Sequence, residues 1–347
     1  MKDLLIYGAY GYTGKIIVDE ALAKGLKPTL AGRSEEKTKA LAESKGLEYL
    51  AFSLDDTKAL DNCLNDHKVV IHCAGPFIHT AKIMADACLR TKTHYLDITG
   101  EYQVFELMKT YSDKAQEVGI MIMPGAGFDV VPSDCLAGHL KSLLPEADSL
   151  LMSFTGLGGG LSRGTAKTMV ENAHEGQQYR KDGLLVTKPA GSSTKIINYG
   201  EFEQPSVGIS WGDISTAHHS TGIPNIEVLM GSTEGQIKKM KKMNSFKWLL
   251  KMRFVKNFLQ KQIDKKPAGP SDQKREKGRM FLWGEATSGD KKVEARLTTP
   301  NGYTLTANTS ILIAQKILNG DFKTGFQTPA SAYGKDLILE VPETKFF

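Results

Sequence analysis

Residues 4–14 read LLIYGAYGYTG, and this stretch decides the fold of the first part of the chain. The apolar run Leu4–Tyr7 predicts a buried strand, and the glycine-rich turn after it leads into a helical pattern. Gly8 permits a sharp turn, Gly11 lets the backbone approach a pyrophosphate, and Gly14 lets helix and strand pack closely. The helix N-terminus offers N–H groups and a partial positive charge to phosphates. We therefore predict a dinucleotide site formed by Gly8, Tyr10, Gly11, Tyr12, Thr13 and Gly14.

The same theme repeats through residues 1–132. Apolar runs alternate with helical patterns, and glycines 25, 46 and 119 fall where helix C-terminal caps are expected. This alternation is typical of a parallel sheet with helices on both faces, an α/β doubly wound Rossmann fold. The predicted strands are Leu4–Tyr7, Pro28–Ala31, Leu50–Ser53, Val69–Cys73, His94–Asp97 and Ile120–Met123.

After Pro132 the pattern becomes that of an α+β domain. Ser288-Gly289-Asp290 predicts a hairpin turn between two alternating runs, and Asn301-Gly302 predicts a second hairpin leading into Tyr303–Thr306. Pro267–Lys277 is interpreted as a polar loop. We therefore expect a second domain with a mixed or antiparallel sheet over residues 133–322.

The end of the second predicted strand distinguishes NADP from NAD. An enzyme that uses NAD usually places Asp or Glu there to bind the ribose 2′-hydroxyl. Here the strand is followed by Arg33 and Ser34, with Lys37 one turn into the next helix. A guanidinium and a hydroxyl bind a 2′-phosphate, which a carboxylate would repel. We expect NADP(H) to be preferred over NAD(H).

Two further turns follow predicted strands, at the edge where ligands bind in this architecture. The fourth strand is followed by Ala74, Gly75, Pro76 and Phe77. The small residues would let the nicotinamide ribose lie against the backbone, and Phe77 would wall the ring. Asp55 follows the third strand, where it either contacts the adenine edge or forms the N-cap of the next helix.

With these residues in place, the chain resembles the saccharopine dehydrogenase-like family, which includes bacterial trans-acting enoyl reductases. The resemblance rests on motifs that span almost the whole chain in order: GAYGYTG (8–14), AGR (31–33), CAGPF (73–77), HYLDITGE (94–101), PGAGFDVVPSD (124–134), LWGEA (282–286), TPNGYTLTA (299–307) and GFQTPASAYG (325–334). It implies a Rossmann domain, a second domain with an extended sheet, and a C-terminal segment, 323–347, that returns to the first domain. It also implies an NADP(H) or NAD(H) cofactor and reactions that range from saccharopine formation to reduction of an enoyl group on a lipid.

The proton donor is the least defined part of the site. No tyrosine is followed by a lysine four residues later, so the Tyr-x-x-x-Lys pair of short-chain dehydrogenases is not supported. Asp129 follows the sixth strand and is our candidate catalytic acid, or the residue that orients one. The alternative is a helix cap, since Pro132 suits a first helical turn and Ser133 or Asp134 would complement the helix dipole.

No metal site is predicted. His218 and His219 are adjacent, and on a strand their side chains would point to opposite faces. We find no third ligand at a sensible spacing, so we predict no bound metal.

Composition and charge limit the partners. Hydrophobic residues make up 41% of the chain and charged residues 24%, as in globular proteins with a large core. The four cysteines form no Cys-x-x-Cys pair, which suits a reducing compartment, and the N-terminus lacks a signal-peptide pattern. We expect a cytoplasmic protein. The net charge of +5 includes +10 from residues 238–266, so the remainder is acidic and a nucleic-acid role is disfavoured.

The basic segment 238–266 has two interpretations. Within it, residues 246–259 mix cations with large apolar groups, so the segment either contacts an anionic membrane or forms a partly buried helix with snorkelling lysines. For the whole chain we expect an NADPH-dependent oxidoreductase, acting as a monomer or homodimer, that reduces a C=C (enoyl) or C=N bond of a small or lipid-like substrate. A non-catalytic NADPH-binding sensor or scaffold, and a peripheral lipid-surface protein, stay open as alternatives.

Overall fold

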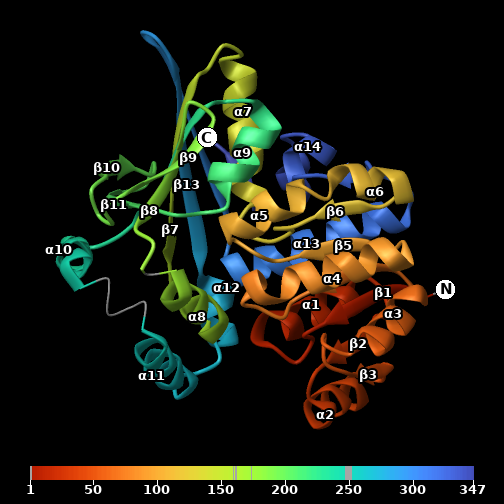
Figure 1. Cartoon of the computed structure of the whole chain (residues 1–347). Helices are drawn as coiled ribbons and strands as arrows, with labels where there is room; N and C mark the ends of the chain where they lie inside the picture. Colours follow the sequence, from red (N-terminus) through yellow and green to blue (C-terminus); the bar gives the residue numbers. More distant parts are fainter. Residues whose placement is uncertain (1, 159, 161, 173, 247–251) are drawn as a thin grey trace. The chain divides into compact units, whose positions relative to one another are not determined.

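The computed structural model describes residues 2–158, 160, 162–172, 174–246 and 252–347 (Figure 1). The chain forms two compact units. The first contains residues 1–131 and 303–332, and the second contains residues 132–302 and 333–347. Each unit has its own sheet, and the two are described separately below.

The first unit has a parallel seven-stranded sheet in the order β15-β6-β5-β4-β1-β2-β3. The direction of winding reverses between β1 and β4, so their carboxyl ends form the topological switch point where ligands bind in such folds. The predicted doubly wound α/β fold is confirmed. The strands are β1 (Lys2–Tyr7), β2 (Thr29–Gly32), β3 (Tyr49–Ala51), β4 (His67–His72), β5 (His94–Asp97), β6 (Met121–Met123) and β15 (Gly325–Phe326).

The strands of this sheet are apolar because both faces are covered. On one face, Leu5 and Val70 belong to a buried cluster with side chains from α3, α4, α5 and α6. Leu4 and Ile6 alternate with Leu5 and so point to the other face, and they are buried too. A parallel sheet covered on both faces needs such continuous apolar runs. The helices of this unit are α1 (Tyr12–Ala23), α2 (Glu35–Lys45), α3 (Thr57–Asn65), α4 (Phe77–Thr91), α5 (Tyr102–Lys109), α6 (Ser112–Val118), α13 (Gly302–Leu318) and α14 (Pro329–Tyr333), of which α13 and α14 extend one residue into the second unit.

The segment that returns to the first unit differs from the expected one. It covers residues 303–332, whereas 323–347 was predicted. Asn301-Gly302 does not form a hairpin, because α13 begins at Gly302 and continues through the largely buried run that follows. Thr309 donates to the carbonyl of Ala126, which ties α13 to the loop after β6. The last residues belong instead to the second unit, since β16 (Lys345–Phe346) pairs with β14 (Lys291–Pro300).

The second unit has a nine-stranded mixed sheet with β10-β11-β12-β7-β13-β14-β16 as its main order. Its β12 and β7 are parallel, and the other neighbouring strands along this order are antiparallel. The predicted hairpin at Ser288-Gly289-Asp290 joins β13 to β14. The remaining strands are β7 (Ser149–Leu157), β8 (Gln177–Lys181), β9 (Leu184–Lys188), β10 (Thr194–Asn198), β11 (Glu203–Ile209), β12 (Asn225–Gly231) and β13 (Arg279–Ser288).

Two sequence interpretations in the second unit are wrong. His218 and His219 lie on α9 rather than on a strand, because the segment continues without a breaker until Gly222 caps it. The predicted loop Pro267–Lys277 contains α12, which Ser271 caps by accepting the N–H of Lys274. The helical segments are α7 (Val131–Leu143, whose first residue lies in the first unit), α8 (Arg163–Asn172), α9 (Asp213–Thr221), α10 (Glu234–Met243), η1 (Asn244–Phe246), α11 (Arg253–Asp264), α12 (Asp272–Lys277) and η3 (Leu337–Glu340).

Candidate functional site

The glycine turn after β1 is closed too tightly for side chains. Gly8 has φ +82°, and a Cβ there would lie 2.9 Å from the backbone nitrogen of Ala74 at the end of β4. A Cβ on Gly14 would lie 2.5 Å from the carbonyl oxygen of Gly8 and 2.8 Å from that of Ala9. Gly11 closes the turn by donating its N–H to the Gly8 carbonyl. The strand, turn and helix are therefore held in the arrangement that the motif predicts.

The turn fits the pyrophosphate of a dinucleotide. Gly11 is the N-cap of α1 and forms no side-chain capping hydrogen bond, so no capping side chain occupies the helix end. The first N–H groups of a helix have no intrahelical partner, and α1 begins just after β1, which lies at the switch point of the sheet. Gly8, Gly11 and Gly14 thus form a tight backbone turn at the start of α1, which we call the glycine cradle, whereas Thr13 lies in the first turn of α1.

The two tyrosines of the motif have packing roles. The ring of Tyr10 covers Gly32, where an added Cβ would lie 2.5 Å from the Tyr10 Cε1 atom. Tyr12 packs edge-on against Tyr303 of α13, with the ring centroids 5.0 Å apart. Tyr10 therefore lies between the glycine turn and the end of β2, next to the predicted 2′-phosphate site.

The predicted 2′-phosphate residues lie together at the start of α2. Arg33 and Lys37 are exposed, and Ser34 is the N-cap of α2, where its hydroxyl accepts the N–H of Lys37 at 3.4 Å. The capping role of Ser34 was not predicted, and it leaves the hydroxyl hydrogen available to donate to a phosphate oxygen. Glu35 and Glu36 lie in the same first turn of α2 beside these two cations, so binding of a 2′-phosphate here stays a prediction.

Asp55 does not cap the helix that follows it. The N-cap of α3 is Asp56, which accepts the N–H of Ala59 at 3.0 Å. The capping alternative for Asp55 is therefore wrong by one residue. Asp55 is exposed and accepts the Ser53 hydroxyl at 3.1 Å, so its contact with adenine stays a prediction.

The turn after β4 combines exposed and buried residues. Gly75 is exposed, and Ala74 and Pro76 are partly exposed. Phe77 begins α4 and is buried, with its ring edge-on to His72. Phe77 therefore supports this turn from the core side, and the small residues before it form the accessible surface.

Glu101 is a residue of this edge that the sequence reasoning missed. Its carboxylate accepts the N–H groups of Phe77 at 2.9 Å and Ile78 at 2.8 Å, and only 3% of the residue is exposed. It thus caps α4 from the loop after β5, 24 residues away in sequence. A cap at this separation gives no local signal, although Glu101 ends the HYLDITGE motif.

Asp97 at the end of β5 joins two loops of the edge. It accepts the hydroxyl of Tyr95 at 2.5 Å, the N–H of Thr99 at 2.9 Å and the N–H of Gly125 at 2.8 Å. Burial raises the pKa of Asp97 to about 6, although these hydrogen bonds lower it. Tyr95 therefore packs in the core, and Asp97 holds the turn that follows β5.

Asp129 lies at the same edge, in the turn between β6 and α7. Its carboxylate packs against Gly100, where an added Cβ would lie 2.8 Å from Oδ2. Burial, and then the charge of Glu101, raises the pKa of Asp129 to about 7. The residue as a whole is partly exposed, and its carboxyl group, which packs against Gly100, has a pKa near neutral pH at this edge.

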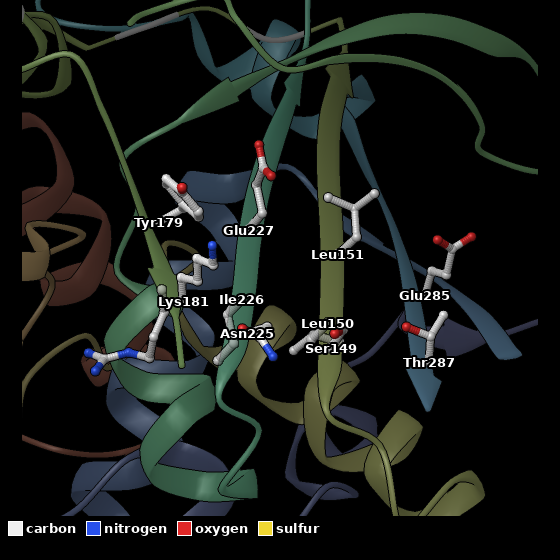
Figure 2. A pocket seen from close by; sticks show the side chains of 11 residues that line it. Ser149, Leu150, Leu151, Tyr179, Lys181, Asn225, Ile226, Glu227, Glu285 and Thr287 are labelled. Atoms are coloured by element: carbon white, nitrogen blue, oxygen red, sulfur yellow. The ribbon is translucent and has the colours of Figure 1, made fainter. Parts of the chain in front are cut away.

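The second unit contains an open pocket of about 310 Å³ on its sheet. Figure 2 shows Leu151 of β7 between Glu227 of β12 and Glu285 of β13. Glu227 accepts hydrogen bonds from Gln177 and Lys188, and Glu285 forms ion pairs with Lys195 and Lys292. All the lining residues belong to the second unit, whereas every predicted cofactor residue belongs to the first.

The fold and the glycine cradle define a dinucleotide-binding protein of the Rossmann class. Residues 4–123 match the family model of the saccharopine dehydrogenase NADP binding domain. The first unit therefore contains an NADP(H)-binding domain of the saccharopine dehydrogenase type.

Similar proteins agree with this assignment. A mouse saccharopine dehydrogenase-like oxidoreductase is 28% identical over 177 residues, which is 44% of this chain and 41% of the mouse protein. A Mycobacterium tuberculosis protein named as a trans-acting enoyl reductase is 28% identical over 216 residues, 56% of this chain and 51% of that protein. The fold also resembles apo saccharopine dehydrogenase (L-Glu forming) from Saccharomyces cerevisiae, with a TM-score of 0.68 at 16% identity over 100% of both chains.

The sequence matches cover about half the length of these relatives. Within the part of the chain that the structure describes, no helix is both long and apolar enough to cross a membrane.

Proposed function

We propose that this chain is an NADPH-dependent reductase that adds hydrogen across a C=C bond of an enoyl group or across a C=N bond. The observation on which the proposal rests is Asp129, whose carboxyl group has a pKa raised to about 7 at the edge that holds the glycine cradle. A reductase of this kind needs a hydride source and a proton donor that is protonated near neutral pH. The relative named as an enoyl reductase supports the C=C option.

Different residues of the first unit bind different parts of the cofactor in this proposal. Gly8, Gly11 and Gly14 admit the pyrophosphate to the N-terminus of α1, and Arg33 and Lys37 hold the 2′-phosphate. Bound NADPH supplies the hydride. Ala74 and Gly75 leave room for the nicotinamide end at the carboxyl edge of β4.

Asp129 supplies the proton in this proposal. Its O–H bond breaks as the new C–H or N–H bond forms at the atom next to the one that receives the hydride, and solvent then reprotonates the carboxylate. The charge of Glu101, which caps α4, contributes to the raised pKa of Asp129 and so helps to keep this carboxyl group protonated.

The experiment measures the oxidation of NADPH through the loss of its fluorescence, in the presence of panels of enoyl thioesters and cyclic imines. Asp129→Asn should lower turnover about 100-fold while the affinity for NADPH changes less than about twofold. The matched control is Asp66→Asn, at an exposed position of the same unit, which should change neither quantity. Retention of full turnover by Asp129→Asn would exclude the proposed donor.

The pH dependence gives a second test. Asp129 donates only while it is protonated, and its pKa is about 7, so turnover should be highest below pH 7 and should fall as the pH rises through it. A protein that binds NADPH but oxidises it with no substrate of either panel would instead be the sensor or scaffold.

We also propose that the protein works in a reducing compartment such as the cytoplasm. All four cysteines are free thiols, and three of them are buried. Cell fractionation with the tagged full chain tests this location, and recovery in an oxidising compartment would contradict it.

A further inference from the structure

The outer face of α11 carries large apolar side chains that the second unit does not cover. Phe254 is 69% exposed and Phe258 is 60% exposed, one helical turn apart. Lys261 and Lys265, both exposed, continue the same stripe at the spacing that keeps residues on one helix face. We call Phe254, Phe258, Lys261 and Lys265 the α11 stripe.

The opposite face of α11 is anchored to α8, beside which Figure 1 draws it. Lys256 donates to the carboxylate of Glu171 at 3.2 Å and to its carbonyl at 3.1 Å, and Gln260 donates to the same carboxylate at 3.1 Å. Asp264 pairs with Lys167 at 2.7 Å. These contacts fix which face points outward, so rotation of α11 that buried the two phenylalanines would break them.

The charge around the stripe is positive. Residues 253–266 contain five Lys or Arg and one Asp, and that Asp is already paired with Lys167. The exposed lysines 238, 239, 241 and 242 on α10 add to the same basic segment. The rest of the chain is acidic, so the basic character is confined to this part of the second unit.

We propose that the α11 stripe docks the protein on the surface of an anionic phospholipid bilayer. Phe254 and Phe258 would enter the boundary between headgroups and acyl chains, and Lys261 and Lys265 would contact the phosphates. An interfacial helix needs such an apolar stripe beside cations. Aromatic rings and lysines also bind single-stranded nucleic acid, but the acidic remainder of the chain opposes that partner. Residues 247–251 of the basic segment lie outside the described residues, and the stripe does not depend on them.

The test is sedimentation of the full chain with phosphatidylcholine vesicles that contain or lack phosphatidylglycerol. We expect binding to the anionic vesicles that weakens as salt is raised, and little binding to the neutral ones. The double variant F254S/F258S should need at least about tenfold more lipid for half-binding, because the apolar burial is lost. The double variant K261Q/K265Q should bind more weakly and with less dependence on salt.

Matched variants control for general effects. L184S/I196S removes apolar groups that are 69% and 67% exposed elsewhere on the same unit, and K39Q/K58Q removes two exposed lysines of the first unit. Both should bind vesicles as the parent does. Thermal unfolding and NADPH titration of every variant verify the fold. The proposal is overturned if the parent chain does not bind anionic vesicles, or if F254S/F258S binds them with the same affinity as L184S/I196S. It is also overturned if the parent chain binds a single-stranded RNA oligomer and not the vesicles.

Discussion

The cofactor edge of the first unit and the pocket of the second unit are built in opposite ways. At the cofactor edge, glycines and backbone groups lie in contact, and the buried carboxylates of Asp97 and Glu101 bind backbone N–H groups. In the pocket, Glu227 and Glu285 pair with lysine side chains that are partly exposed. The first arrangement tolerates little change, whereas the second allows side chains to move.

This difference also explains what each region reveals in sequence. The glycine turn is local, and each glycine has a steric reason that a motif can express. The pocket brings together side chains from β7, β8, β12 and β13, whose neighbourhood depends on strand order. A sequence motif therefore predicts a site best where the backbone itself forms it.

The largest effect should come from Asp97→Ala. The substitution leaves the Tyr95 hydroxyl and the N–H groups of Thr99 and Gly125 without their acceptor in the interior, so the free energy of unfolding should fall by about 4 kcal/mol. Urea denaturation measures it. Asp3→Ala is the control, because Asp3 forms an exposed ion pair with Lys68 and should cost less than about 1 kcal/mol. If the two variants lost the same free energy of unfolding, the buried carboxylate of the cofactor edge would be no more important than an exposed ion pair.

The next effect is that of Gly14→Ala on cofactor binding. The added methyl group would lie 2.5 Å from the Gly8 carbonyl oxygen, and the turn must open to admit it. We expect the Kd for NADPH to rise about 100-fold, equivalent to about 3 kcal/mol. Fluorescence titration measures the Kd.

The control for this variant is Gly235→Ala on α10. The nearest atom to an added Cβ at Gly235 lies 4.0 Å away, so neither binding nor stability should decrease. Tight NADPH binding by Gly14→Ala would show that the close packing of the turn is not required.

Arg33→Ala should have a smaller and selective effect. Loss of the guanidinium removes a 2′-phosphate contact, so the Kd for NADPH should rise about 10- to 30-fold while the Kd for NADH stays unchanged. Lys39→Ala, at an exposed position of α2 that pairs with Glu43, controls for the loss of a nearby charge. Parallel weakening of NADPH and NADH binding would contradict the assigned role.

The smallest effect is expected in the second unit, for Glu285→Gln. Its partners Lys195 and Lys292 have side chains that are 40% and 50% exposed, so solvent screens both ion pairs. The free energy of unfolding should decrease by no more than about 1 kcal/mol in the same denaturation assay. A loss as large as that of Asp97→Ala would show that the pocket is as rigid as the cofactor edge.

The sequence predicted the first unit well because its signals are local. The six expected strands of the doubly wound sheet are present, since each is an apolar run that ends at a turn. The glycine turn has the expected close contacts, and the cap at Gly46 is left-handed. Some features could not be predicted because they depend on residues that are distant in sequence, as with Glu101. Others could not be predicted because the local sequence favours two structures equally.

Asn301-Gly302 illustrates such an alternative. Asn and Gly favour a hairpin turn, and both residues are also favoured at the start of a helix. The apolar residues after them decide for α13, because they pack in the first unit. At Asp55 and Asp56, two adjacent residues could cap α3, and only the backbone geometry selects Asp56.

The return of residues 303–332 to the first unit has a consequence for synthesis on the ribosome. Residues 1–131 of the nucleotide domain emerge long before α13 and β15, and the sheet cannot be completed until these two elements follow. An isolated fragment 1–131 would lack the edge strand beside β6 and the hydroxyls that bind the Ala126 carbonyl. The first unit can therefore complete its fold only after residues 132–302 of the second unit have been synthesised.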